Sequence, residues 1–332
     1  MFNITFFIIL VLLNYFLFLF NYKIANKLNL FDHPNTIRKI HKHKIPITGG
    51  TIFYLNLLLI ILFKNNYEYG NFINLSHFNL SVFILCLTLI FFIGIYDDKY
   101  NLSPNKKLLY TFLVCVFFVY FNANFRIKEL NFLFYSQAIN LNSFSFIFTI
   151  FCFLVFMNAF NMIDGINGLS VSYFFICFFY LLISGFDLKL FFYFCVPIIF
   201  FLFNNFSNKI FLGDGGALML AFLLSCFFIQ NHNLENIYAD QIVLLMILPG
   251  LDMIRVTFVR IINNKHAFDA DNNHLHHILL AKYGKKISYS IIITLILISS
   301  LFSITFDYKY INLFLIIFLL IIYLVLVRKK IE

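Results

Sequence analysis

Charged side chains are scarce in this sequence. Asp, Glu, Lys and Arg make up only 12% of its 332 residues, whereas 62% of the residues are hydrophobic. A soluble globular domain carries about 25% charged residues, so the composition excludes an ordinary soluble protein. Internal repeats and linkers rich in Pro, Gly or Ser are also missing. These absences predict a single integral membrane domain over residues 1–332, without a large soluble part.

Cysteine pairs and a cleavable leader are missing too. The six cysteines lie in apolar stretches and show no Cys-x-x-Cys spacing, so we expect buried thiols rather than a disulfide framework or a metal site. The first apolar stretch has neither a basic segment before it nor a small-residue cleavage pattern after it. We therefore expect a retained helix there rather than a removable signal peptide.

Apolar stretches, by contrast, are frequent. A transmembrane helix needs about 20 mostly apolar residues, and eleven stretches reach this length or come close to it. They lie near residues 4–20, 45–63, 78–96, 108–121, 137–157, 169–184, 190–203, 217–229, 242–254, 287–304 and 310–327. The sequence therefore predicts an all-α fold, a polytopic bundle of about eleven transmembrane helices.

The distribution of Lys and Arg predicts how the bundle is oriented. When crossings are counted from the N-terminus, all but five of the 24 Lys and Arg residues fall in loops of one face or in the C-terminal tail. The positive-inside rule assigns that face to the cytoplasm, with the N-terminus outside and the C-terminus inside. The expected cytoplasmic loops are residues 21–44, 97–107, 158–168, 204–216 and 255–286. Because the positive charge is scattered over these loops, we expect the bilayer and no nucleic acid as a partner.

Most of the aspartates lie in five short polar segments that this count of crossings places on the same face. They are Asp32, Asp97, Asp98, Asp164, Asp214, Asp252, Asp269 and Asp271. A carboxylate near hydrocarbon is costly to keep ionised, so their gathering at one face predicts a site for a metal ion and phosphates. The adjacent pair Asp97 and Asp98 indicates a bound cation or a proton that one of them holds. A solvated helix end with Lys counter-charges is the alternative for that pair.

Asparagine, glycine and aspartate recur in two of the loops. Asn158, Asn161 and Asp164 are spaced by three residues, so in a helix they share a face that can hold a metal shell or the polar edge of a sugar or base. Asp214 stands among three glycines before an apolar stretch. Such a turn aims backbone N–H groups at an anion, while Asp214 holds the accompanying cation. An ordinary polar turn is the weaker interpretation of each segment.

Histidines and basic residues occupy the first and last loops. In a helix, His274 and His277 would share a face, whereas His276 would point elsewhere. Cysteines or carboxylates at the usual zinc spacing are missing nearby, so the Asp oxygens favour a hard ion such as Mg²⁺, and the histidines suit substrate phosphates. An ordinary basic loop is the alternative. The basic first loop can anchor the chain at the membrane surface or supply cations to a diphosphate.

Five motifs, taken in order, resemble those of the polyprenyl-phosphate N-acetylhexosamine-1-phosphate transferases, glycosyltransferase family 4, with the phospho-MurNAc-pentapeptide transferase as a distant relative. They cover the chain from Asp32 to about Gly284 and read D-x-P…RK-x-H…P…GG, DD…LSP..K, N-x-x-N-x-x-D-G-x-x-G-L, G-D-x-G and D-x-x-R…H-x-H-H. Asn167 and Asn272 depart from the commonest pattern, which has Asp and Arg there, and one residue is added between Pro34 and Arg38.

This resemblance implies an enzyme and its substrates. It implies transfer of a sugar 1-phosphate from a UDP-N-acetylhexosamine, with UDP-GlcNAc expected, to undecaprenyl phosphate, with release of UMP. The product would start a cell-envelope glycan such as O-antigen lipopolysaccharide. The active site is expected to face the cytoplasm from the bacterial inner membrane. Mg²⁺ is the expected cofactor, with Mn²⁺ as the alternative, and a homodimer is left open.

The resemblance also implies residue roles. Expected metal ligands are Asp214, Asp98 and Asn161, and expected catalytic residues are Asp97, Asp98 and Asp164. Expected substrate-binding residues are Asn158, Asn161, Arg38, Lys39, His41, Lys107, His274, His276 and His277. The reaction would be an in-line attack by the lipid phosphate, or a double displacement through an Asp nucleophile.

Two other classes of membrane protein remain as alternatives. An ion-coupled transporter would carry charges in the middle of its spans, but the predicted spans are almost free of charge. A structural membrane subunit would not need so many acids on one face.

Overall fold

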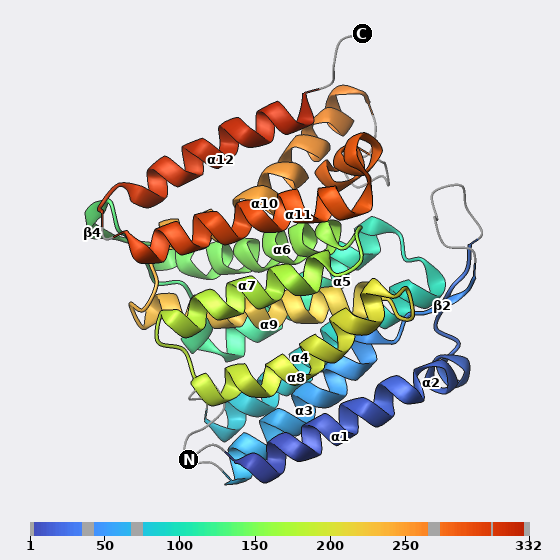
Figure 1. Ribbon diagram of the computed structural model, residues 1–332. Coiled ribbons are helices and arrows are strands. Elements are labelled where there is room, and N and C mark those ends of the chain that lie inside the picture. The colour runs from blue at the N-terminus through green and yellow to red at the C-terminus, as the bar shows by residue number, and fades with distance from the viewer. Residues whose placement is uncertain (1–2, 35–42, 68–75, 265–272, 307, 329–332) are drawn as a thin grey trace. The chain divides into compact units, whose positions relative to one another are not determined.

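The structure is a computed structural model that describes residues 3–34, 43–67, 76–264, 273–306 and 308–328. Helices dominate these residues (Figure 1). The helices are α1 (Ile4–Leu19), α2 (Asn21–Leu28), α3 (Gly49–Tyr67), α4 (His77–Tyr100), α5 (Pro104–Phe121), α6 (Ser145–Ile163), α7 (Leu169–Ile183), α8 (Leu188–Phe206), α9 (Gly213–Asn233), α10 (Ala239–Ile262), α11 (Leu275–Thr305) and α12 (Ile311–Val327). The described residues also form two antiparallel pairs of short strands, β1 (Phe31–Asp32) with β2 (Ile45–Pro46) and β3 (Glu129–Phe132) with β4 (Tyr135–Asn140). Two short 3-10 helices, η2 (Ala123–Phe125) and η3 (Asn142–Phe144), lie on either side of the second pair.

The helical fold class predicted from the sequence is confirmed. Each of the eleven apolar stretches coincides with a helix, because a long apolar run can satisfy its backbone groups within membrane only as a helix. Two boundaries were wrong. The stretch expected from residue 45 begins in β2, and α3 starts only at Gly49. The stretch expected from residue 137 begins in β4, and α6 starts only at Ser145, because Gln137, Asn140 and Asn142 interrupt the apolar run.

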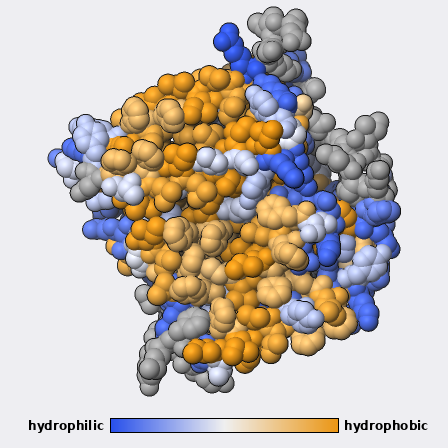
Figure 2. Space-filling model, in the orientation of Figure 1, coloured by the Kyte–Doolittle hydropathy of each residue, from blue (hydrophilic) through white to orange (hydrophobic). Residues whose placement is uncertain are grey.

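The number of crossings stays a prediction. Within the described residues, six helices are long and apolar enough to span a bilayer, or seven if α1 and α2 form one bent span. Large apolar side chains such as Phe203 and Phe314 lie on the outside, 71% and 63% exposed. Figure 2 shows a mostly apolar surface on the face in view. The chain is therefore a multi-pass membrane protein, while the expected orientation of its termini stays a prediction.

The chain divides into two compact units. Unit one comprises residues 1–122 and 187–223, and unit two comprises residues 123–186 and 224–332. In unit one, α4 packs on α5, and α8 packs on both α1 and α3 (Figure 1). In unit two, α10 packs on α6 and α12, while α11 packs on α7 and α12. Each unit thus buries apolar helix faces against neighbouring helices of its own.

Aromatic rings pack against one another in the cores of both units. In unit one, the Phe118 ring packs edge-on against Phe222, with centroids 4.9 Å apart. In unit two, the rings of Phe178 and Phe227 stack at 5.5 Å. All six cysteines are free thiols, four of them buried and two half-buried. The expectation of buried thiols is therefore confirmed for Cys86, Cys115, Cys177 and Cys226.

A pair of buried amides joins α1 to α3 inside unit one. The Asn14 side-chain amide donates to Asn56 Oδ1 at 2.7 Å, and the Asn56 amide donates back to Asn14 Oδ1 at 3.1 Å. Each amide also donates to a carbonyl of its own helix. Because both side chains are fully buried, this reciprocal pair fixes the register of the two helices.

Asn14→Leu should lower the free energy of unfolding by about 1 kcal/mol, because it leaves Asn56 without its interhelical partner. The double variant Asn14→Leu/Asn56→Leu leaves no polar group unpaired and should be closer to the original protein. Chemical unfolding of both variants in detergent measures the difference. A single variant as stable as the double one would contradict the role of the pair.

Candidate functional site

Four charged residues gather at helix ends in unit one, and we call Asp97, Asp98, Lys107 and Asp214 the acidic cluster. Asp97 and Asp98 lie in the last turn of α4, Lys107 in the first turn of α5 and Asp214 in the first turn of α9. Lys107 Nζ lies 2.8 Å from Asp97 Oδ2 and 2.8 Å from Asp214 Oδ2. One ammonium group therefore joins the carboxylates of two helices.

A tight connection between α4 and α5 brings Asp97 and Lys107 together. Asn101 ends α4 with a left-handed φ of 51°, and α5 begins at Pro104. Asparagine tolerates that conformation, and the fixed φ of proline suits the first position of a helix. Asp97 Oδ1 also accepts a hydrogen bond from the backbone N–H of Leu102 at 2.7 Å. The local sequence thus holds both charged groups at one turn.

Asp98 binds the first turn of α9. Its Oδ1 accepts from the N–H of Asp214 at 2.8 Å, and its Oδ2 accepts from the N–H of Gly215 at 3.1 Å. A carboxylate is stabilising at a helix N-terminus, where N–H groups lack partners and the helix dipole is positive. The sequence predicts a substrate anion at this turn, whereas these two N–H groups bind an anion of the chain itself.

Lys107 supplies the positive charge of the acidic cluster. Burial lowers the pKa of Lys107, but the negative charges of Asp214 and Asp97 together raise this pKa by more than burial lowers it. The pKa therefore lies above its usual value, and the ammonium group persists at neutral pH. The oxygens of Asp97 and Asp214 are donors that suit Mg²⁺, and here they bind Lys107. No group of three or more His, Cys, Asp or Glu in the described residues is arranged to hold a metal. Metal binding by Asp214, Asp98 and Asn161 stays a prediction.

Two glycines let the backbone of α9 approach α3 and α4. A Cβ atom on Gly94 would lie 2.4 Å from Gly215 Cα and 2.5 Å from the carbonyl oxygen of Asp214. A Cβ atom on Gly50 would lie 2.4 Å from Gly216 N. Real Cβ atoms do not come this close to backbone atoms, so only glycine fits at positions 50 and 94. The first turn of α9, which carries Asp214, is therefore seated between two glycines.

In unit two, the turn between α6 and α7 touches the start of α11. Asp164 caps the C-terminal end of α6 and accepts a hydrogen bond from the Ser170 hydroxyl of α7. The next residue, Gly165, lies directly under the His276 ring, because a Cβ there would be 2.0 Å from His276 Nε2. We call residues 158–168 the asparagine motif and residues 274–277 the histidine motif. The two motifs are therefore adjacent, as the resemblance implies.

One polar atom of the Asn158–Asp164 spacing is buried without a hydrogen-bond partner in the described residues, and it is Asn161 Oδ1. The His276 ring is also buried, at 5% exposure, and contacts the rings of His274 and His277. Asn158 instead donates to the carbonyl of Leu154 in its own helix at 2.8 Å. Buried polar groups are normally paired, so the unsatisfied Oδ1 of Asn161 indicates a place for a polar ligand.

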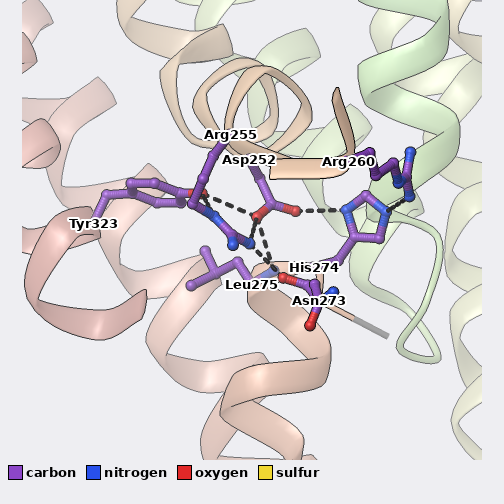
Figure 3. A network of polar contacts seen from close by, with 7 residues as sticks. All are labelled: Asp252, Arg255, Arg260, Asn273, His274, Leu275 and Tyr323. Carbon is purple, nitrogen blue, oxygen red and sulfur yellow. Dashed lines mark hydrogen bonds and ion pairs between the residues drawn. The ribbon is translucent and has the colours of Figure 1, made fainter. Parts of the chain in front are cut away.

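Asp252 is the centre of a buried network, shown in Figure 3. Its Oδ1 accepts from Arg255 Nη2 and from the N–H of Leu275, both at 2.9 Å, and from the Tyr323 hydroxyl at 3.1 Å. Its Oδ2 accepts from His274 Nδ1 at 2.9 Å. One carboxylate of α10 thus binds α11 and α12.

The same network fixes the tautomer of His274. Its Nε2 lies 3.4 Å from Arg260 Nη2, and a guanidinium can only donate. Nε2 therefore accepts, and the proton sits on Nδ1, which donates to Asp252. Diphosphate binding by His274 stays a prediction, as its two ring nitrogens contact Asp252 and Arg260 in this structure.

One expectation about the three histidines was wrong. His276 does not point away from the others, since its ring is stacked on that of His274 at 5.7 Å and lies 4.1 Å from that of His277. The reason is that His274 precedes α11 as its N-cap, with extended φ and ψ. Helical spacing therefore does not apply between His274 and the residues that follow it.

Other expected site residues lie outside the described residues. They are Arg38, Lys39 and His41 of the first loop and Asp269 and Asp271 of the last loop. The structure describes the remaining candidates in two groups, the acidic cluster in unit one and the asparagine and histidine motifs in unit two. Their convergence on one substrate stays a prediction.

Gly94, Arg260 and Tyr323 were missed in the sequence. Gly94 and Tyr323 lie in long apolar runs, where a glycine or a tyrosine is unremarkable for packing. The only available signal for Tyr323 is its hydroxyl, which needs a partner when the ring is buried. Arg260 resembles any basic residue near the end of a helix.

Comparisons with known proteins agree with the motifs. Residues 80–232 match the family model described as Glycosyl transferase family 4. The chain is similar to the undecaprenyl-phosphate alpha-N-acetylglucosaminyl 1-phosphate transferase of Yersinia pestis, with 27% identity over 78% of this chain and 71% of the relative. The protein of that name from Escherichia coli (strain K12) is 26% identical over 80% and 72%. A probable undecaprenyl-phosphate N-acetylglucosaminyl 1-phosphate transferase of Bacillus subtilis (strain 168) is 26% identical over 85% and 78%.

Gly94→Ala should destabilise the protein by about 1–3 kcal/mol, because the added methyl group meets backbone atoms of α9 that cannot move aside as a side chain could. Gly250→Ala is the matched control, since a Cβ on Gly250 meets nothing within 4 Å. Unfolding of both variants in detergent measures the effect. Equal stability of the two variants would show that the contact at Gly94 is not a constraint.

Asp252→Ala should lower the free energy of unfolding by about 3–5 kcal/mol, because it leaves Arg255 and His274 without their shared acceptor. Tyr323→Phe removes one hydroxyl and should cost only about 1 kcal/mol. The same unfolding experiment compares the two. If both substitutions cost the same, Asp252 is not the centre of the network.

Proposed function

Because this chain is related to the glycosyl transferase family 4 proteins and its resemblance to the polyprenyl-phosphate sugar-1-phosphate transferases is confirmed, we propose that it transfers a sugar 1-phosphate to undecaprenyl phosphate. The proposed donor is a UDP-N-acetylhexosamine, with UDP-GlcNAc as the first candidate, and the products are undecaprenyl-diphosphate-sugar and UMP. The relatives are named for transfer of N-acetylglucosaminyl 1-phosphate to this lipid, which supports both the acceptor and the sugar.

The observation that carries the proposal is the contact of the buried His276 ring with Gly165, which brings the histidine motif onto the asparagine motif. Asn161 of the same motif has a buried Oδ1 without a partner in the described residues, which a polar ligand would satisfy. A nucleotide sugar offers hydroxyl, amide and phosphate groups for that purpose. We assign Asn158, Asn161, His276 and His277 to donor binding.

The acidic cluster handles the phosphates. Both substrates are anionic, so bringing them together requires cations, and Lys107 is a buried one. We assign to Asp97 the orientation of the lipid phosphate, which is already mostly ionised at neutral pH because its second pKa is about 6. Mg²⁺, when bound, would neutralise diphosphate charge, and Asp97 and Asp214 carry oxygens that suit it.

The reaction itself is an in-line displacement. An oxygen of the lipid phosphate forms a bond to the phosphorus that bears the sugar, and the bond from that phosphorus to the oxygen shared with UMP breaks. UMP leaves with the electron pair of that bond, so no other reactant is needed. A double displacement would instead pass through a phosphorylated Asp, which trapping without lipid acceptor would reveal.

Purified protein incubated with undecaprenyl phosphate, Mg²⁺ and UDP-GlcNAc should release UMP. Asp214→Asn should reduce the turnover number by roughly 10²–10³-fold, because Asp214 positions the Lys107 ammonium group and one lost contact of that kind to developing charge has about this effect. Glu235→Gln, which changes an exposed acid between α9 and α10, is the matched control and should keep full activity. A panel of UDP-sugars that yields no UMP, or an Asp214→Asn variant with full activity, would overturn the assignment.

A further inference from the structure

Helix α2 follows α1 directly but turns away from it by 63°. One side of this short helix is anchored to unit one, because Asn21 and Ala25 are buried. The Asn21 amide donates to the carbonyl of Lys209 at 3.1 Å, and its Oδ1 accepts from the Thr48 hydroxyl. The bend is therefore held by contacts outside the helix itself.

The other side of α2 carries lysines and aromatic rings. Lys23 and Lys27 are exposed on the helix, and Lys44 and Lys209 are exposed on the segments that adjoin it. These four residues form what we call the α2 lysine patch. Tyr22 on the same helix is 48% exposed.

Aromatic rings hold two of these ammonium groups in place. Lys44 Nζ lies 4.6 Å from the ring centroid of Phe31 and 5.4 Å from that of Tyr22. Lys23 Nζ lies 5.1 Å from the ring centroid of Phe20. Such cation–π contacts orient a charge without neutralising it.

The α2 lysine patch makes no ion pair within the described part of the chain. No carboxylate within those residues lies within 4 Å of the four ammonium groups. Leu19 and Phe20, at the junction of α1 and α2, are 56% and 41% exposed. Exposed apolar side chains beside unpaired lysines fit a lipid surface better than a soluble acidic protein, because a bilayer accepts both.

We propose that α2 lies along the lipid–water boundary and that its lysine patch binds the headgroups of anionic phospholipids. The helix has the amphipathic, Lys-rich and Tyr-bearing character of interfacial helices, and phosphodiester headgroups supply the negative charge that the patch lacks. This contact is separate from the proposed transfer reaction, since none of the four lysines is among the residues assigned to it.

Native mass spectrometry of the full chain, released from mixed detergent with phosphatidylglycerol or phosphatidylcholine, measures retained lipid. The protein should keep phosphatidylglycerol in preference, and 0.5 M NaCl before exchange should weaken that retention. Lys23→Gln/Lys27→Gln should reduce phosphatidylglycerol retention by roughly 25-fold, at about fivefold for each lysine near an anionic surface.

Lys128→Gln/Lys309→Gln is the matched control, since it also removes two exposed lysines, and it should leave retention unchanged. Circular dichroism of both double variants verifies their folding, which exposed substitutions should preserve. Equal retention of the two lipids, equal loss in both double variants, or insensitivity to salt would overturn the proposal. Binding of soluble poly-L-glutamate through the patch, without lipid preference, would assign it to an acidic protein and overturn the proposal as well.

Discussion

Two hydrogen bonds from the first turn of α9 to the Asp98 carboxylate are the contact on which the acidic cluster depends. They attach the start of α9 to the last turn of α4. The backbone approach that they require leaves no room for a side chain at Gly94. With α9 placed in this way, Asp214 reaches Lys107, and Lys107 reaches Asp97. Charge, hydrogen bonding and close packing therefore act together in unit one.

Unit two uses the same physical device. Asp252 in α10 accepts a hydrogen bond from the N–H of Leu275 at the start of α11, as Asp98 in α4 does from the start of α9. In each case the carboxylate of one helix stabilises the positive end of a later helix. The carboxylate of Asp252 also accepts hydrogen bonds from His274, Arg255 and Tyr323 (Figure 3). Motif residues of both units thus hold helices in place, in addition to any role that they have toward substrates.

The sequence was sufficient for the helices because hydropathy is a local property, and every predicted apolar stretch coincides with one. The resemblance placed the asparagine and histidine motifs in one site, and in the structure Gly165 contacts the His276 ring. Contacts between distant segments could not be read in this way. Tyr323 lies 71 residues after its partner Asp252, and Asp98 lies 116 residues before the N–H group that it accepts from. His276 was misjudged because the helix begins one residue after His274, a boundary that composition does not fix.

The six cysteines, which are free thiols within apolar helices, have a practical consequence. Alkylating reagents such as maleimides attack the thiolate in water, a species that apolar surroundings suppress. A cysteine introduced in an exposed loop would therefore react much faster than the native ones. Each loop can thus carry a single reporter in the natural background, without first building a cysteine-free protein.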